Sequence, residues 1–336
     1  MRAMLTTAHG DRSVLQLDEN FPEPVAGDNQ VIVDVRATAV NAHDLMTRRG
    51  MPGIRLKLPV IVGSDISGVV QSTGPGVADR WVGKRVLIDP VYREGKRIGM
   101  LGESRHGGRA ERVAVGEDQL LELPDGVSFN AAASLPLAYG TAWGMMVRRG
   151  RVSAGENILI LGASGGVGAA CVQIAKLMGA QVVACASSES KIARLKEIGA
   201  DHVVNYSETP FREAVYEILG KPRMAGGGGV DVAVNFTGGD TMLDTQKCVG
   251  MRGRILCCGA TAGYELMIDA RYWWTFEHEM IGSDGWNTND LESLLDLINQ
   301  GKLNPVIDKV LPLEETAEAE RLLEDREVFG KVLIKP

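Results

Sequence analysis

The chain has 336 residues, more than one ordinary hydrophobic core serves, so its length favours two domains. Hydrophobic residues make up 45% of it and charged residues 24%, a balance typical of globular proteins that excludes a disordered chain. The formal net charge of −7 disfavours nucleic acid as the main partner, and no stretch approaches the roughly 20 consecutive apolar residues that a membrane span needs.

The first 125 residues are predicted to form a β-rich domain. Residues typical of strands occupy Val31–Ala37, Ser67–Val70 and Arg85–Asp89. Turn-forming residues, such as those of Gly74–Gly76, separate these segments. We therefore expect a domain built mainly from short strands.

From residue 126 to residue 300 the pattern changes to alternating strands and helices. Asn157–Leu161 is a short apolar strand, and Val167, Cys171, Ile174 and Met178 follow at the spacing of a helix that packs on a sheet. This alternation predicts an α/β fold, a doubly wound parallel sheet of the Rossmann type. Further strands are expected at Gln181–Cys185, Val230–Phe236, Arg254–Cys258 and His278–Ser283, and a helix at Lys191–Ile198.

Two other segments belong outside this core. Gly226–Gly229 is expected to be a flexible surface connection, because four glycines cannot pack a core. Residues 301–336 contain a charged helix around Leu322 and Leu323 and a last strand at Lys331–Ile334. We expect this last segment to complete the first domain.

A glycine-rich loop connects the first strand of the alternating part to its first helix. Dinucleotide binding needs small residues there, because one glycine makes the turn, another lets the backbone approach the pyrophosphate, and a third lets the helix pack on the strand. The phosphates then meet the positive end of the helix. The predicted phosphate-binding residues are Gly162, Ser164, Gly165, Gly166, Val167 and Gly168.

The end of the second strand bears on which nicotinamide cofactor binds. An NAD site usually has a carboxylate there, but this strand ends at Ala186 without one. Ser187, Ser188 and Lys191 follow and suit the 2′-phosphate of NADPH, although Glu189 would repel it. In the alternative interpretation, a serine caps the next helix and Lys191 is only solvated. The predicted cofactor-binding set also includes Tyr206, Thr237 and Gly259.

Several segments, taken together in their order and spacing, resemble the medium-chain dehydrogenase/reductase superfamily. Within it the chain is most similar to the zinc-free quinone-oxidoreductase-like members. The resemblance implies a GroES-like, partly barrelled catalytic domain, a Rossmann domain and a cleft between them. The segments that carry it are 37–44, 59–70, 107–111, 134–136, the glycine-rich loop and 330–332.

The resemblance also implies that the chain has no catalytic zinc. Zinc-dependent relatives have a cysteine where this chain has Asn41, a histidine where it has Ser64, and a cysteine or aspartate where it has Leu137. A catalytic zinc needs three protein ligands and an open position, which these residues do not supply. One alternative stays open, a metal site built from other side chains, namely His43, Asp44, Asp65 and His106.

Five cysteines, all after residue 170, predict no disulfide framework and leave none for a structural zinc lobe. We expect them to be small buried side chains in a cytoplasmic protein, because Met1–Leu5 is followed too soon by polar residues to be a signal peptide. Asp89–His106 is longer than in most zinc-free relatives and resembles the remnant of such a lobe. Descent from alcohol dehydrogenases therefore remains an alternative.

Without a metal ion, hydride addition to a conjugated C=C bond or a quinone is easier than alcohol oxidation. Asn41 is the candidate polar contact, since similar members keep an asparagine there. Met46 stands where several of those members have a tyrosine, so the proton donor is unassigned and Tyr92 or Tyr139 are candidates, with water as a further source. Residues Tyr272–Phe276 form an aromatic cluster that either lines an apolar substrate pocket or packs in a core or subunit interface.

The sequence therefore predicts an NADPH-dependent, zinc-free reductase of activated C=C bonds, quinones or related carbonyls. Two alternatives remain: a zinc-independent alcohol or ketone dehydrogenase, and an NADPH-binding protein with little turnover. The expected partner is a small-molecule substrate, with neither nucleic acid nor a membrane involved. Pairing of edge strands around Met280–Ser283, usual in the family, suggests a homodimer or homotetramer.

Overall fold

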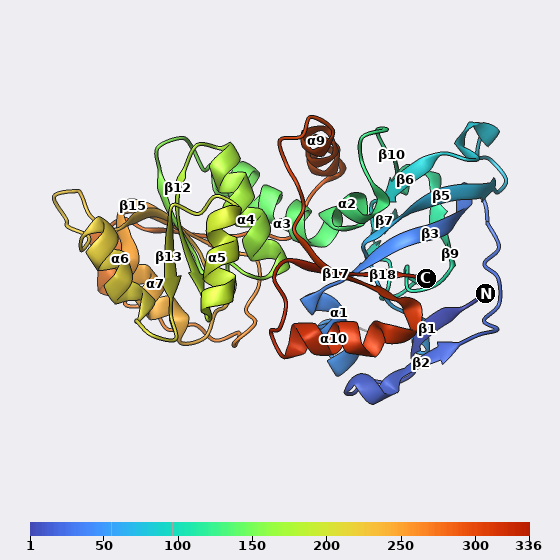
Figure 1. Cartoon of the computed structure of the whole chain (residues 1–336), viewed down its shortest axis with the longest axis horizontal. Coiled ribbons are helices and arrows are strands. Elements are labelled where there is room, and N and C mark those ends of the chain that lie inside the picture. Colours follow the sequence, from blue (N-terminus) through green and yellow to red (C-terminus); the bar gives the residue numbers. More distant parts are fainter. Residues whose placement is uncertain (55, 96) are drawn as a thin grey trace. The chain divides into compact units, whose positions relative to one another are not determined.

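Two sets of strands, one mostly antiparallel and one parallel, organise the residues that the computed structural model describes, 1–54, 56–95 and 97–336 (Figure 1). They belong to two compact units, Met1–Ala138 with Leu291–Pro336, and Tyr139–Asp290. Residues 126–138 and 291–300, assigned by the prediction to the Rossmann domain, pack with the first unit instead. One reason is helix α2 (Phe129–Ala133), whose Phe129 carbonyl accepts a hydrogen bond from Ser67 Oγ of the first unit at 2.7 Å.

The main sheet of the first unit is organised around β3 (Gln30–Val40), which pairs antiparallel with three other strands. One of them is β18 (Lys331–Lys335), so the last strand joins the first unit as the sequence suggested. The order is β10-β6-β5-β3-β18-β17, with β9 also on β3. The other strands are β5 (Ile66–Thr73), β6 (Arg85–Ile88), β9 (Arg112–Gly116), β10 (Leu120–Glu122) and β17 (Ile307–Pro312).

Alternate residues of β3 build the core of this unit. Val31, Val33 and Val35 are buried and pack with Ile66 and Val86, as the two-residue period of a strand requires. The remaining helices of the unit are α1 (Ala42–Arg49), α10 (Thr316–Glu324) and most of α9 (Thr288–Asn299). Its short strands are β1 (Ala3–Thr6), β2 (Leu15–Asp18), β4 (Val60–Ile61), β7 (Val91–Glu94) and β8 (Arg97–Met100).

The second unit contains a six-stranded sheet whose strands all run parallel, in the order β13-β12-β11-β14-β15-β16. Helices α4 and α5 cover one face, and α6 and α7 cover the other (Figure 1). The strands are β11 (Asn157–Ile160), β12 (Gln181–Ala186), β13 (His202–Asn205), β14 (Val230–Val234), β15 (Val249–Cys257) and β16 (Glu279–Gly282). The helices are α3 (Thr141–Trp143), α4 (Gly166–Leu177), α5 (Glu189–Glu197), α6 (Phe211–Leu219), α7 (Thr241–Cys248) and α8 (Ala270–Thr275).

The predicted α/β fold class is confirmed, and the predicted strands occur with ends that differ by a few residues. The largest difference is at β15, which begins at Val249 rather than Arg254. Among the described residues, no helix is both long enough and apolar enough to cross a bilayer.

The glycine run Gly226–Gly229 is exposed at Gly226 and Gly227, as a surface connection should be. Each of its residues has a positive φ, from 74° to 87°, a left-handed backbone that favours glycine. A Cβ on Gly228 would also lie 2.2 Å from the Lys221 carbonyl oxygen. The cysteines are buried at Cys171, Cys185 and Cys248 but partly exposed at Cys257 and Cys258, where β15 ends.

Candidate functional site

The strand order of the parallel sheet reverses between β11 and β14, and α/β sheets bind ligands at the carboxyl ends of the strands beside such a reversal. The predicted cofactor residues are far apart in the sequence, yet each group follows the carboxyl end of a different strand. The loop Gly162–Gly168 follows β11, Ser187 and Ser188 follow β12, Tyr206 follows β13, Thr237 follows β14, and Gly259 follows β15.

The glycine-rich loop has the geometry that a pyrophosphate needs. Gly162 has a φ of 62°, a conformation that favours glycine. A Cβ on Gly168 would lie 2.2 Å from the Gly162 carbonyl oxygen, so only glycine lets α4 begin this close to β11. Gly165 precedes α4, whose first backbone N–H groups have no partner within the helix and attract an anion. The residues present therefore fit a dinucleotide.

At the end of β12, the structure contradicts the alternative in which Ser188 caps the next helix. Ser188 occupies the N-cap position of α5, but its Oγ lies 3.2 Å from Ser190 Oγ and makes no capping bond. The Glu189 carboxylate accepts a hydrogen bond from Asn205 Nδ2 at 3.1 Å. This bond orients the carboxylate toward the end of β13. Lys191 lies in the first turn of α5 and is half-buried.

The other three predicted cofactor residues surround the same carboxyl ends. Tyr206 is 42% exposed, so its ring is accessible to a ligand. The Thr237 N–H donates to Asn235 Oδ1 at 3.0 Å, which fixes the loop after β14. Gly259 is exposed and has open space where a side chain would project.

In the first unit, Asn41 lies in a buried polar cluster that sequence reasoning did not assemble. Its Nδ2 donates to Asp65 Oδ2 at 3.1 Å, and its Oδ1 accepts a hydrogen bond from Lys331 Nζ. Lys331 Nζ also lies 3.1 Å from Asp65 Oδ2. Lys331 was visible in the sequence only as the polar residue between Gly330 and an apolar strand.

The other two positions where zinc-dependent relatives have ligands lie beside this cluster. The Leu137 N–H donates to Asp65 Oδ1 at 2.9 Å. The Ser64 hydroxyl is buried and has no hydrogen-bond partner among the residues described. Asp65 thus receives hydrogen bonds from Asn41, Leu137 and Lys331, and the ammonium supplies the positive charge in the cluster.

A second group of buried charges holds helix α1 in position. Asp44 Oδ2 accepts hydrogen bonds from the Asn41 N–H at 3.0 Å and from Arg109 at 2.8 Å. Arg109 also pairs with Glu320 of α10, and Arg48 donates to the same carboxylate at 2.7 Å. Asn41 is the N-cap residue of α1, and the bond from its N–H to the side chain of Asp44, the third helical residue, fixes the backbone at Asn41.

The four residues of the alternative metal site have separate partners. His43 Nε2 donates to Glu103 at 2.7 Å, and His106 Nδ1 accepts from the Ile61 N–H at 3.1 Å. Asp44 and Asp65 are held by Arg109 and Lys331 as described above. In the parts of the chain that the structure describes, no three His, Cys, Asp or Glu side chains converge as metal ligands would.

The tyrosines considered as proton donors are both buried. Tyr139 is fully buried and its hydroxyl donates to Gln173 at 3.1 Å. Tyr92 is 5% exposed and its hydroxyl pairs with Ser104. Both hydroxyl groups thus bond to protein side chains.

The segment Asp89–His106 forms a hairpin of β7 and β8, within which Lys96 lies outside the described residues. After the hairpin, residues 101–106 bring Glu103 to His43. Sequence reasoning missed Glu103, although the unusual length of this segment pointed to it.

The aromatic cluster separates into a stacked part and an exposed part. Tyr272 stacks on Phe276 with ring centres 5.5 Å apart. Trp273 and Trp274 are 45% and 67% exposed, so neither packs in the core of its unit. Of the interpretations considered, core packing therefore applies only to the stacked pair.

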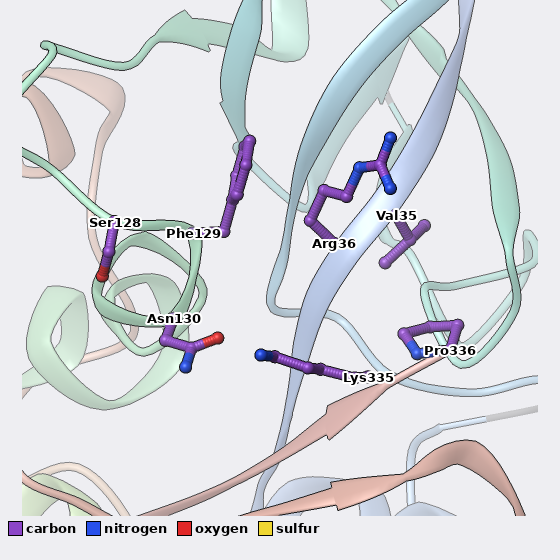
Figure 2. Close-up of a pocket in the computed structure, with 7 residues that line it drawn as sticks. All are labelled: Val35, Arg36, Ser128, Phe129, Asn130, Lys335 and Pro336. Atoms are coloured by element: carbon purple, nitrogen blue, oxygen red, sulfur yellow. The ribbon is translucent and has the colours of Figure 1, made fainter.

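A surface pocket of about 430 Å³ lies in the first unit. Figure 2 shows the residues that line it. None of the predicted site residues lines it, so it is separate from the Asn41 cluster. Its lining residues are Val35, Arg36, Ser128, Phe129, Asn130, Lys335 and Pro336.

Two family models match the chain. Residues 27–125 match the alcohol dehydrogenase GroES-like domain, which confirms the GroES-like character of this region. Residues 166–300 match the zinc-binding dehydrogenase family, a range that excludes Asn41, Ser64 and Leu137.

Three similar proteins span nearly the whole chain. Quinone oxidoreductase-like protein 2 of Bos taurus is 31% identical over 333 residues, which cover 95% of this chain and 88% of the relative. The crystal structure of an NAD-dependent alcohol dehydrogenase is 37% identical over the full length of both chains, with a TM-score of 0.92. The structure of a 2-octenoyl-CoA carboxylase reductase in complex with NADP and 2-octenoyl-CoA is 28% identical, covers 99% of this chain and 87% of that one, and has a TM-score of 0.88.

These matches agree with the strand order, the glycine-rich loop and the antiparallel first unit. The chain therefore belongs to the medium-chain dehydrogenase/reductase superfamily of nicotinamide-dependent oxidoreductases, as one of its quinone-oxidoreductase-like members.

Proposed function

We propose that this protein is an NADPH-dependent reductase that works without zinc and reduces activated C=C bonds, quinones or related carbonyls. The observation that carries the proposal is the buried cluster of Lys331, Asn41 and Asp65. The Lys331 ammonium, which is bonded to Asn41 and Asp65, supplies positive charge where zinc-dependent relatives use a metal ion. A divalent cation beside it would be repelled.

The loop after β12 supports the choice of NADPH. Ser187, Ser188 and Lys191 offer hydroxyl groups and one cation, and no carboxylate occupies the end of the strand itself. The bond from Asn205 draws Glu189 toward β13, which reduces its repulsion of a 2′-phosphate. The relative solved with NADP and 2-octenoyl-CoA further supports NADPH and a conjugated C=C substrate.

In this proposal, one unit supplies the residues that bind the cofactor, and the other supplies the polar cluster around Asn41. The dinucleotide, when bound, supplies a hydride to the substrate. The glycine-rich loop and the start of α4 hold its phosphates, and the polar cluster around Asn41 stabilises negative charge that develops on a substrate oxygen. Asn41 Nδ2 carries two protons, and the bond to Asp65 uses one of them, which leaves the second for this contact.

A decisive experiment follows NADPH oxidation with a panel of enones and quinones, in buffer treated with a chelator. Turnover that persists after metal removal, in protein without stoichiometric zinc, supports the proposal. Activity that depends on bound zinc, or the absence of any affinity for NADPH and NADH, would refute it.

A second candidate function is a zinc-independent alcohol or ketone dehydrogenase. The 37% identity with an NAD-dependent alcohol dehydrogenase favours it. Alcohol-dependent reduction of NAD⁺ or NADP⁺ in metal-free buffer, without turnover of enones or quinones, would establish this alternative. Tight NADPH binding without turnover of any substrate would instead indicate a binding protein.

We also propose a homodimer or homotetramer that forms through β16, and a location in the reducing cytoplasm. Strand β16 lies at the edge of its sheet and pairs with β15 on one side. A second copy of the strand could extend the sheet.

The proposed location rests on the cysteines. All five are free thiols, which is consistent with a reducing compartment.

A further inference from the structure

His43 and Glu103 form an ion pair beside Asn41, with His43 Nε2 2.7 Å from Glu103 Oε1. His43 is the second residue of α1, which starts directly after Asn41. The two side chains are 23% and 20% exposed, so the pair is sheltered yet accessible. Tyr92 and Tyr139, the other candidates for a proton donor, are more deeply buried, with exposures of 5% and 0%.

The surroundings of His43 favour its protonated form. Burial disfavours the charged ring, but the hydrogen bond to Glu103 and the charges of Asp44, Glu103 and Asp65 outweigh burial and raise the pKa of His43. The cations nearest to these carboxylates are Arg109, which pairs with Asp44, and Lys331, which pairs with Asp65. Each cation is thus bonded to its own carboxylate, and Glu103 is the direct partner of the imidazolium.

We propose that His43, oriented by Glu103, donates the proton that completes reduction of a conjugated C=C bond. This inference rests on the proposed function and names a residue for its unassigned step. When hydride adds to the β-carbon of an enone, the π electrons move toward the carbonyl and form an enolate. Because Nε2 is bonded to Glu103, the Nδ1–H bond of His43 then breaks as its proton forms a bond to the α-carbon, and Nδ1 of the neutral imidazole takes a new proton from water.

This proposal also explains why the segment 89–106 is longer than in most zinc-free relatives. The segment provides Glu103, which holds the ring in one orientation and stabilises its positive charge, as carboxylates paired with histidine do in acid–base catalysis. Glu103 is thus a positioning residue, while His43 contacts the substrate.

The test compares His43→Gln and Glu103→Gln with wild type and with His202→Gln, a control at an exposed residue of β13. The substrates are an α-methyl enone and a quinone. Protonation of carbon is slow in water, but the oxygen of a hydroquinone anion is protonated rapidly by water. We expect His43→Gln to lower enone turnover by about 100-fold or more, the usual contribution of a general acid, and to spare quinone turnover.

Product stereochemistry gives a second readout. In D2O, wild type and His202→Gln should deliver deuterium to one face of the α-carbon, and His43→Gln should give a mixture because water then donates from both faces. Equal enone rates and an unchanged single-face product in His43→Gln would overturn the inference. If the wild type turns over neither substrate, the proposed function itself fails.

A third readout needs no cofactor and no turnover. NMR titration of the unloaded protein should show His43 with a raised pKa, and Glu103→Gln should lower that pKa.

Turnover gives a matching readout. The alkaline limit of enone reduction, the pH above which the rate falls, should move to lower pH in Glu103→Gln for the same reason. This variant also covers the case in which His43→Gln fails to fold, since an unchanged titration and an unchanged alkaline limit would overturn the inference.

Discussion

Lys331 Nζ lies 3.1 Å from Asp65 Oδ2, and both side chains are buried, with exposures of 2% and 0%. The two residues are far apart in the sequence and meet because β18 pairs with β3 just where β3 leads into Asn41. Antiparallel pairing of the last strand thus places a cation in the polar cluster of the first unit. A buried charge of this kind is tolerated only because its partner and hydrogen bonds compensate for lost hydration.

Lys331→Met should destabilise the protein by about 3–5 kcal/mol, the usual cost of leaving a buried partner charge unpaired. Denaturant unfolding of the variant measures this change. Lys335→Met is the matched control, because Lys335 lies on the same strand but is exposed. Equal effects of the two substitutions would contradict the role assigned to the Lys331–Asp65 pair.

Gly168→Ala should weaken NADPH binding strongly. The new Cβ would lie 2.2 Å from the Gly162 carbonyl oxygen, so either α4 or the loop must move and the phosphate cradle changes shape. Fluorescence titration with NADPH checks the affinity. Gly282→Ala serves as the control, since open space surrounds that position in the same unit, and comparable affinity losses in both variants would argue against the cradle.

Periodicity and turn residues predicted most of the fold. The strand–helix alternation after residue 157 and the glycine-rich loop are local signals, and the structure has strands and a helix there as expected. The edges of the units were less predictable, because the packing of α2 on the first sheet depends on contacts such as Ser67 with Phe129 that no local pattern reveals.

The candidate site could be predicted only in part, for the same reason. Ser188 and Thr237 follow different strands of the parallel sheet, β12 and β14, whose carboxyl ends share one edge, so the sequence could assign both to the predicted cofactor site. Lys331 and Glu103 were missed, because each meets Asn41 or His43 through a contact over a long sequence separation. Their signals were weak: a lysine that opens an apolar strand, and a segment of unusual length.

Lys191→Ala should lower the affinity for NADPH by about 10- to 100-fold, consistent with the roughly 1.5–3 kcal/mol of a hydrogen bond to a charged group. Affinity for NADH, which has no 2′-phosphate, should change little. Paired titrations of both nucleotides measure the difference. Lys196→Ala on the exposed side of the same helix should leave both affinities unchanged, and an equal loss for NADPH and NADH in Lys191→Ala would refute the phosphate assignment.

The His43–Glu103 pair should also make stability depend on pH in a defined direction. Because the folded state raises the pKa of His43 above that of the unfolded chain, the pair stabilises the protein fully at pH values below the unfolded pKa. That contribution is lost as pH rises through the folded pKa. Free energies of unfolding, measured from pH 5.5 to pH 9, should therefore differ most between wild type and His43→Gln at the acidic end. A difference that stays constant or grows toward alkaline pH would show that the ring is not held in its protonated form.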